Sequence, residues 1–370
     1  MKKIVLCLLA LLSVFSIAIL SGCNKKDDSV ELAVVTDVGQ LMDGGFNQGT
    51  YEGVKQYAEK NKKNYAYYQP ENGANATDND RIAAMELAIE KGAKVIVAPG
   101  FLQATAMETV AKAHTDVKFV FVDGWNMGLD NVTAISYKEQ ESGFLAGYAA
   151  VMDGYTKLGG VFGGGGSNPA CNRFCCGYIQ GAEAAAKEKD VQVQMTVSFR
   201  HGSSFSASNE LQSQVALWYS GGIEVVFSCG GSMVNSVIAA ANETQNGKVI
   251  GVDTDQAGLS ERVITSAVKG LTSSVMLVLE KYYAGKWDAE LADKTSNLGA
   301  KEDSTGLPTA DSSWRFTTFT KEQYNTVLKG IKDGTITISA DTPEDCSSST
   351  AFASYMATLT HVTLLHEFGK

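Results

Sequence analysis

Asp37-Val-Gly-Gln-Leu-Met-Asp-Gly-Gly-Phe-Asn-Gln48 is the stretch around which this chain is organised. It follows Leu32-Ala-Val-Val-Thr36, an apolar run rich in β-branched residues that predicts a buried strand. It precedes residues 50–59, in which apolar residues recur at helical spacing. We therefore interpret the stretch as the turn from a strand's carboxyl end into a helix, where open α/β sheets bind their ligands.

The side chains of this turn suit a ligand that has both hydroxyl groups and a flat ring. Asp37 is a carboxylate, Gly44-Gly45 is a flexible pair, and Phe46 is an aromatic followed by the amide of Asn47. The alternative is an ordinary βα turn in which Asp and Gly serve only the turn geometry.

Length and charge limit the classes of protein to consider. A chain of 370 residues exceeds one average domain, so two lobes are expected. With 44% hydrophobic and 19% charged residues, the composition indicates a globular protein. The formal net charge is −10, and it becomes −12 without residues 1–22, which contain Lys2 and Lys3 but no acid. An acidic surface argues against binding to nucleic acid or to anionic lipid through charge.

The amino terminus predicts a lipoprotein signal peptide over residues 1–22. Met1-Lys-Lys3 is a basic segment, residues 4–20 are apolar, and Leu20-Ser-Gly-Cys23 fits the bacterial lipobox, in which Cys23 receives lipid. A transmembrane anchor is the alternative, but the apolar run is short for a span. Residues 23–30 form a polar tether, and we expect the protein to be anchored at the extracytoplasmic face of the cell membrane.

The rest of the chain alternates between apolar strand candidates and amphipathic helical stretches. Strands are expected at 31–36, 64–69, 94–99, 117–123, 158–163, 191–199, 223–229 and 248–253. Helices are expected at 47–60, 79–91, 103–114, 139–153, 174–188, 208–219 and 232–243. This alternation predicts βαβ units in two doubly wound parallel-sheet lobes of the α/β class, joined near Tyr137.

The carboxyl-terminal part of the chain is less regular. A helix is expected at 320–330 and a strand near Thr335–Ile338, while residues 341–370 stay unassigned. Glycines and carboxylates follow several of the predicted strands, so both sheets are expected to present them at one edge. Two such edges facing each other would form a ligand cleft between the lobes.

Several motifs together resemble the basic membrane protein family of bacterial surface lipoproteins, which includes the purine nucleoside receptor of spirochaetes. They are the lipobox, Asp37 with Asp43-Gly-Gly-Phe-Asn-Gln-Gly-Thr-Tyr-Glu-Gly53, Phe121-Val-Asp-Gly124, Glu141-Ser-Gly-Phe-Leu-Ala-Gly147 and Gly251-Val-Asp-Thr-Asp-Gln256. The resemblance covers roughly residues 30–338. It implies the type I periplasmic-binding-protein fold, in which two lobes joined by three crossings close on a ligand.

The resemblance also implies how the chain divides between the lobes. Residues 31–137 and about 260–290 would form the N-terminal lobe. Residues 138–259 and about 291–340 would form the C-terminal lobe. We expect a monomer without a cofactor, a metal or catalytic residues, which delivers its ligand to an ABC transporter permease.

The resemblance implies a ligand site as well. A purine base would lie between Phe46 and Phe205, with Asn47, Asp123 and Asp37 at its edges. Asp253 would accept hydrogen bonds from the ribose hydroxyls, Lys269 would reach the sugar, and Gly230 would let the backbone approach the ligand. The family often has Lys or Ser in the turn before the aromatic, where this chain has Gly44-Gly45.

Other motifs carry less weight. The run Gly163–Gly166 lacks the spacing of a dinucleotide or phosphate loop, and we interpret it as a crossing between the lobes. Cys171, Cys175 and Cys176 have poor spacing for a metal site, and a disulfide from Cys171 to Cys175 or Cys176 stays open. A receptor for a sugar or another polyol is the alternative ligand class. A surface nucleoside hydrolase, suggested only by the pair Asp253 and Asp255, is the alternative of another kind.

Overall fold

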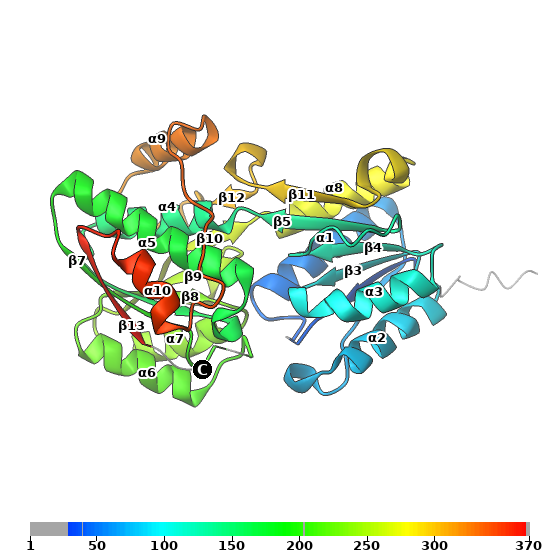
Figure 1. The fold of residues 1–370 in the computed structure, drawn as a ribbon, viewed down its shortest axis with the longest axis horizontal. Helices are drawn as coiled ribbons and strands as arrows, with labels where there is room; N and C mark the ends of the chain where they lie inside the picture. The colour runs from blue at the N-terminus through cyan, green and yellow to red at the C-terminus, as the bar shows by residue number, and fades with distance from the viewer. Residues whose placement is uncertain (1–28, 39, 203, 368–370) are drawn as a thin grey trace, which may run out of the picture.

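The computed structural model describes residues 29–38, 40–202 and 204–367. The predicted signal peptide and Cys23 lie outside the described residues, as does most of the tether. Two α/β lobes lie side by side, and three segments of chain join them (Figure 1). The predicted α/β class with two parallel-sheet lobes is confirmed.

The first lobe is built on a sheet of strand order β11-β5-β4-β3-β1-β2, in which every neighbouring pair is parallel. Its strands are β1 (Leu32–Val35), β2 (Tyr65–Tyr68), β3 (Val95–Pro99), β4 (Lys118–Val122), β5 (Val132–Tyr137) and β11 (Lys294–Leu298). The inner strands β1 and β3 are buried on both faces, as their apolar sequences predict.

Helices cover both faces of this sheet. They are α1 (Phe46–Asn61), α2 (Asp78–Glu90), α3 (Ala104–Ala113) and α8 (Leu271–Tyr283). Alternate residues of β1 point to opposite faces: Leu32 packs with α1 and α8, whereas Ala33 packs with α2 and α3. Thr77 caps α2 in a capping box with Asp80, which satisfies backbone donors at the start of the helix.

The second lobe is built on a sheet of order β12-β10-β9-β8-β6-β7-β13, parallel except for the short pair β10 and β12. Its strands are β6 (Lys157–Phe162), β7 (Val193–Ser198), β8 (Val225–Cys229), β9 (Lys248–Asp253), β10 (Val263–Lys269), β12 (Thr305–Gly306) and β13 (Val362–Glu367). Its helices are α4 (Glu139–Met152), α5 (Pro169–Lys189), α6 (Asn209–Ser220), α7 (Met233–Asn242), α9 (Lys321–Lys332) and α10 (Ser349–Met356). The helices α4 and α5 pack on one face of the sheet, and α6 and α7 on the other.

The three crossings lie close together and are tied to one another by hydrogen bonds. The chain passes from β5 into α4, from β10 into α8, and from β11 to β12. The Ser142 hydroxyl donates to the Val268 carbonyl at 2.7 Å and accepts from the Gly306 amide at 2.9 Å. One side chain of the first crossing therefore joins the other two.

The structure corrects the predicted boundaries of the lobes. Residues from about 260 to 290 were expected in the first lobe; α8 does pack there, but the strand β10 pairs with β9 in the second sheet. The strand β11 pairs with β5 in the first sheet, although residues 291–340 were expected in the second. The join near Tyr137 matches the first crossing. After β10 and after β11 the chain changes lobe within a few residues, so no distinct segment in the sequence indicates the crossing.

Other elements also differ from prediction, beginning with α8, β10, β11 and β12, which were not expected from sequence. The strand β5 was missed because it follows β4 without a helix between them, which breaks the alternation. No strand forms at 335–338, where the chain turns after α9. The tail, unassigned from sequence, forms α10 and then β13 beside β7 (red in Figure 1). Within the described residues, no helix has the length and apolar character needed to cross a membrane.

Candidate functional site

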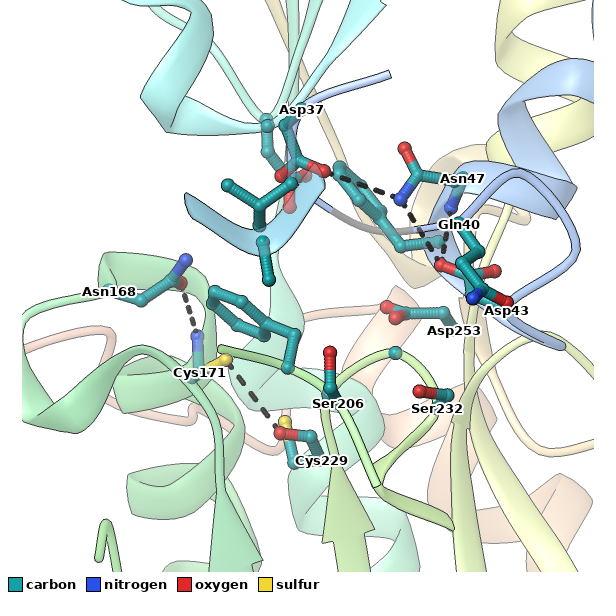
Figure 2. A pocket seen from close by; sticks show the side chains of 18 of the residues that line it. Asp37, Gln40, Asp43, Asn47, Asn168, Cys171, Ser206, Cys229, Ser232 and Asp253 are labelled. Carbon is teal, nitrogen blue, oxygen red and sulfur yellow. Dashed lines mark hydrogen bonds between the residues drawn. The ribbon is translucent and has the colours of Figure 1, made fainter. Parts of the chain in front are cut away.

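A cavity of about 480 Å³ lies between the two lobes, at the carboxyl ends of both sheets. All eight of the ligand-binding residues expected from sequence line it: Asp37, Phe46, Asn47, Asp123, Phe205, Gly230, Asp253 and Lys269. Figure 2 shows Asp37 and Asn47 facing Asn168, Ser206 and Ser232 across the cavity. The structure thus brings together residues that are more than 200 positions apart in the chain.

The wall that the first lobe contributes is organised by the start of α1. Asp43 accepts from the backbone amides of Gly45 at 2.8 Å and Asn47 at 3.0 Å, so its carboxylate caps the helix. The Asn47 side chain donates to Asp37 Oδ1 and to Asp43 Oδ2, at 3.3 Å each (Figure 2). These contacts hold the Asn47 amide in one orientation. Asp43 was not among the expected site residues, although its position just before the helix start is a capping signal.

The glycine pair before Phe46 has a role in joining the lobes. The Gly44 carbonyl accepts from Thr254 Oγ1 at 2.8 Å and from Gln256 Nε2 at 2.9 Å, both in the second lobe. Gly44 has φ of +72°, a conformation that glycine adopts at little cost. The departure from the family pattern at Gly44-Gly45 therefore lies at a contact between the lobes.

The two aromatic residues come from opposite lobes. Phe46 begins α1, and Phe205 lies in the loop after β7 with φ of +57°. The ring of Phe205 rests on glycine backbone: a Cβ at Gly163 would lie 2.4 Å from its Cδ1, and a Cβ at Gly230 would lie 3.0 Å from the same atom. Glycine at both positions is thus required by the place of the ring.

The loop Gly163–Gly166 does not cross between the lobes, contrary to the expectation from sequence. It joins β6 to α5 within the second lobe and ends in a short 3-10 turn, Gly164–Gly166. The glycines were interpreted as a crossing because their actual role, making room for the ring of Phe205, depends on a residue some forty positions away. No sequence motif signals such a contact.

Lys269 lies at the centre of a buried charge cluster where the chain crosses between the lobes. Its ammonium is 2.7 Å from Asp123 Oδ2, 3.3 Å from Asp253 Oδ1 and 3.8 Å from Glu139 Oε1. Asp123 follows β4 in the first lobe, whereas Asp253 ends β9 in the second. The ammonium also lies 4.6 Å from the centroid of the Phe46 ring. Lys269 therefore links carboxylates of both lobes to one of the two aromatics.

Burial and neighbouring charges shift the pKa values in this cluster. Burial raises the pKa of Asp253 to about 6, and Asp123 and Asp43 add to this, whereas Lys269 opposes it. Burial would lower the pKa of Lys269, but Asp123, Asp253 and Glu139 together raise it well above its ordinary value. Lys269 is therefore a permanent cation, and burial brings the pKa of Asp253 close to neutral pH.

Sequence reasoning missed Glu139 and Arg173, which support Lys269 from outside the cavity. Glu139 is fully buried at the start of α4, and its Oε2 accepts from Arg173 Nε at 2.6 Å. Glu139 directly follows the missed strand β5, so its place at the end of a strand was not visible. Glu139 thus pairs with both Lys269 and Arg173, and neither Glu139 nor Arg173 lines the cavity.

Two buried oxygens in the wall lack a hydrogen-bond partner within the described residues. They are Asn47 Oδ1 and Asp123 Oδ1. A buried polar atom without a partner costs about 1–3 kcal/mol. Because both residues line the cavity, a bound ligand with N–H or O–H groups could satisfy them.

The five cysteines of the described chain are all buried free thiols: Cys171, Cys175, Cys176, Cys229 and Cys346. Cys171 and Cys229 line the cavity, and the Cys171 thiol lies 3.9 Å from the Cys229 carbonyl (Figure 2). The disulfides left open by the sequence are not formed in this structure. Among the described residues, no group of three or more His, Cys, Asp or Glu is placed to hold a metal ion.

Two α/β lobes with three crossings and a cavity between them define the type I periplasmic-binding-protein fold. Residues 30–341 match the family model Bmp, described as ABC transporter substrate-binding protein PnrA-like. The chain therefore belongs to this family and is an ABC transporter substrate-binding protein.

Individual relatives agree with this assignment. The chain is 31% identical over 317 residues to the ABC transporter nucleoside-binding protein BmpA of Lactococcus lactis subsp. cremoris, covering 80% of this chain and 86% of that one. It is 29% identical over 304 residues to basic membrane protein D of Borreliella burgdorferi, covering 80% and 84%. Among solved structures, a solute-binding protein of an ABC transporter system from Aeropyrum pernix superposes with a TM-score of 0.73 at 20% identity, covering 89% of this chain and 98% of that one.

Proposed function

We propose that this substrate-binding protein captures purine nucleosides, such as guanosine, adenosine and inosine, and delivers them to an ABC transporter permease. One observation carries the proposal: a single cavity combines an aromatic from each lobe with a cluster of Asp123, Asp253 and Lys269. A nucleoside has a flat base and a sugar with adjacent hydroxyls, which match these two parts.

The aromatic part of the cavity suits the base. Stacking of a base on an aromatic ring is worth about 1–3 kcal/mol and tolerates any purine. Phe46 and Phe205 would cover the two faces of the base as the lobes close. Lys269 lies over one face of Phe46, so the base would use the other face. The unpaired Asn47 Oδ1 and Asp123 Oδ1 would accept from the N–H groups of the base, with Asp37 beside them.

The charged part of the cavity suits the ribose. Asp253 is 5% exposed, and its carboxylate can accept from the 2′ and 3′ hydroxyls. The Lys269 ammonium would donate to a ribose oxygen and already holds Asp253 in place at 3.3 Å. Gly230, with φ of +148°, presents backbone without a side chain to the ligand.

The charge of the cavity favours nucleosides over nucleotides. Among the described residues that line it, Asp37, Asp43, Asp123 and Asp253 carry carboxylates, and the one ammonium, that of Lys269, is already paired with Asp123 and Asp253. A phosphate group would meet a negative field without a free cation. We therefore expect guanosine to bind and guanosine 5′-monophosphate to bind much more weakly.

The alternatives fit this site less well. A sugar or other polyol would use Asp253 and Lys269 but leave Phe46 and Phe205 without a partner. A hydrolase would need Asp253 and Asp255 to converge. Asp255 instead accepts from the Ser313 hydroxyl and the Ala257 amide and does not line the cavity. The relatives are substrate-binding proteins, which fits a receptor without catalytic activity.

Two further parts of the proposal concern the molecule outside the site. We place a lipid anchor on Cys23, supported by the lipobox Leu20-Ser-Gly-Cys23. The anchor and the polar tether would hold a monomer at the outer surface of the membrane, near its permease.

The name of the Lactococcus lactis relative as a nucleoside-binding protein supports the ligand class.

A thermal-shift screen tests the ligand class. A ligand at 100 times its dissociation constant adds about 2.7 kcal/mol to the free energy of unfolding. Guanosine, adenosine and inosine should raise the melting temperature, whereas ribose, guanine and guanosine 5′-monophosphate should raise it less. A shift with ribose as large as that with guanosine would favour the polyol receptor.

Chromatography of inosine after incubation with the protein should show no free hypoxanthine, and its release would indicate a hydrolase.

A further inference from the structure

The carboxyl-terminal segment 342–367, termed the tail below, lies beyond the residues that the family model matches. It is nevertheless an integral part of the second lobe. The strand β13 extends the sheet by pairing with β7 along six residues, and α10 lies over α5 (Figure 1). Phe352 of α10 is fully buried in the core that α4 and α5 share. The tail is therefore docked on the second lobe through a few buried side chains, Cys346, Phe352, Val362 and Leu364.

A buried carboxylate anchors the tail to α5. Glu183 accepts from the backbone amides of Thr360 at 2.8 Å, His361 at 3.0 Å and Val362 at 2.7 Å, and from the Thr360 hydroxyl at 2.7 Å. Burial opposes ionisation, but these donors lower the pKa of Glu183 to about 2. The carboxylate thus fixes the chain directly before β13.

The tail reaches the ligand site first through the glycine loop. The Cys346 amide donates to the Gly166 carbonyl at 2.9 Å. Gly166 has φ of +88°, and a Cβ there would lie 2.4 Å from the Ser347 nitrogen. The same loop carries Gly163, whose backbone supports the ring of Phe205. The tail therefore contacts the glycine loop at Gly166, three residues from Gly163, which supports the Phe205 ring.

The tail reaches the site a second time through β7. The pairing of β13 with β7 continues to Ser198, directly before the loop that carries Phe205. The His366 ring stacks on Phe199, with 6.1 Å between the ring centroids. His366 Nε2 also donates to the Cys346 carbonyl at 2.7 Å. One side chain of β13 therefore connects the loop after β7 with the contact to the glycine loop.

We propose that the tail is a positioning element of the ligand site: through Cys346 and His366 it holds the two loops that fix Phe205. The inference rests on the proposed function for the role of Phe205 in binding. The tail contacts described above are all with residues of the second lobe, whereas Phe46 begins α1 in the first lobe, so we expect the effect on Phe205 alone.

The composition of the loop explains why such support is needed. Four consecutive glycines have a large conformational entropy, which must be offset when the loop is ordered. Each glycine also lacks a side chain that could anchor the loop by packing. Hydrogen bonds from neighbouring elements, including the tail, therefore determine where the Phe205 support lies.

Hydrogen–deuterium exchange of the ligand-free protein tests this directly. The variant His366→Ala removes the bond to Cys346 and the stacking on Phe199. Leu365→Ala is the matched control, because Leu365 is the neighbouring residue and is 56% exposed. We expect faster exchange over residues 162–168 and 199–207 in His366→Ala, and unchanged exchange in the control and over residues 41–50. Unchanged exchange in both loops of His366→Ala would overturn the proposal.

Guanosine affinity provides a second readout that a general loss of stability would not produce. His366→Ala should weaken binding about twofold to tenfold, the range for one lost hydrogen bond. In a double-mutant cycle the loss should largely disappear on a Phe205→Ala background and persist on a Phe46→Ala background. Equal losses on both backgrounds would contradict the assignment. The assignment would also be contradicted by a chain truncated after Asp341 that stays folded and keeps the exchange pattern and the guanosine affinity of the parent. If the parent does not bind guanosine, the proposed function fails, and the exchange experiment still decides the role of the tail.

Discussion

Replacement of Asp253 is the most informative perturbation of the site, because this residue would distinguish a nucleoside from a free base. The carboxylate is buried, and its Oδ1 lies 3.3 Å from the Lys269 ammonium. In Asp253→Ala the ammonium keeps Asp123 at 2.7 Å and Glu139 at 3.8 Å, so it stays paired. The change should therefore act on ribose recognition rather than on the whole cluster.

The expected magnitude follows from the hydrogen bonds that the carboxylate would accept. A hydrogen bond to a charged group contributes about 1.5–3 kcal/mol, which is roughly 10-fold to 150-fold in affinity. The parent should bind guanosine more tightly than 2′-deoxyguanosine by about one such bond. Guanine, which lacks the sugar, should bind weakest. In Asp253→Ala the preference for guanosine over 2′-deoxyguanosine should shrink to within about threefold, while stacking preserves some affinity for the base.

Calorimetric titration of parent and variant with the three ligands measures this ranking. Asp253 has φ of +65°, where Ala costs about 1–2 kcal/mol of stability, so Asp253→Asn is a useful second variant that tolerates this backbone. Asp255→Asn is the matched control, because Asp255 lies two residues away and outside the cavity. A parent that binds guanine as tightly as guanosine, or an Asp253→Ala variant that keeps the full ranking, would refute the reasoning.

Three further predictions concern stacking, pH and the anchor. Phe46→Ala and Phe205→Ala should each lose about 1–3 kcal/mol of guanosine binding by calorimetry, and parent-like affinity in both variants would exclude the base sandwich. The pKa of Asp253 is raised to about 6 in the ligand-free protein, and protons compete with ribose hydroxyls for its ionised form. Guanosine affinity should therefore be full above pH 7 and about tenfold lower at pH 5, whereas a flat profile from pH 5 to 8 in the parent would contradict this role. Cys23→Ala should abolish fatty-acid labelling and leave the signal peptide uncleaved, and a labelled Cys23→Ala protein would show that the anchor lies elsewhere.

Much of the fold could be predicted because its signals are local. Strands such as β1 and β3 are continuous apolar runs, and the helices that follow them end near predicted boundaries. The expected site residues also lie together for a general reason: the carboxyl ends of parallel strands meet at one edge of each sheet. Asp37, Asp123 and Asp253 follow or end three such strands, so periodicity alone placed them at the cleft.

The features that were missed depend on contacts between distant parts of the chain. The crossings after β10 and β11 are short, and nothing in their composition distinguishes them from ordinary turns. The support of Phe205 by Gly163, and of Gly166 by Cys346, joins segments that are far apart in sequence. Glu139 and Arg173 meet only because α4 and α5 pack side by side. Periodicity and turn chemistry report local conformation, and they carry no information on such contacts.

The crystal structure of the protein grown with guanosine tests the central claim most directly. We predict one guanosine between the lobes, with the base between the rings of Phe46 and Phe205. The ribose 2′ and 3′ hydroxyls should lie within hydrogen-bond distance of Asp253, with Lys269 on a ribose oxygen. A ligand-free cavity at saturating guanosine, or a nucleoside whose base contacts neither aromatic, would contradict the account.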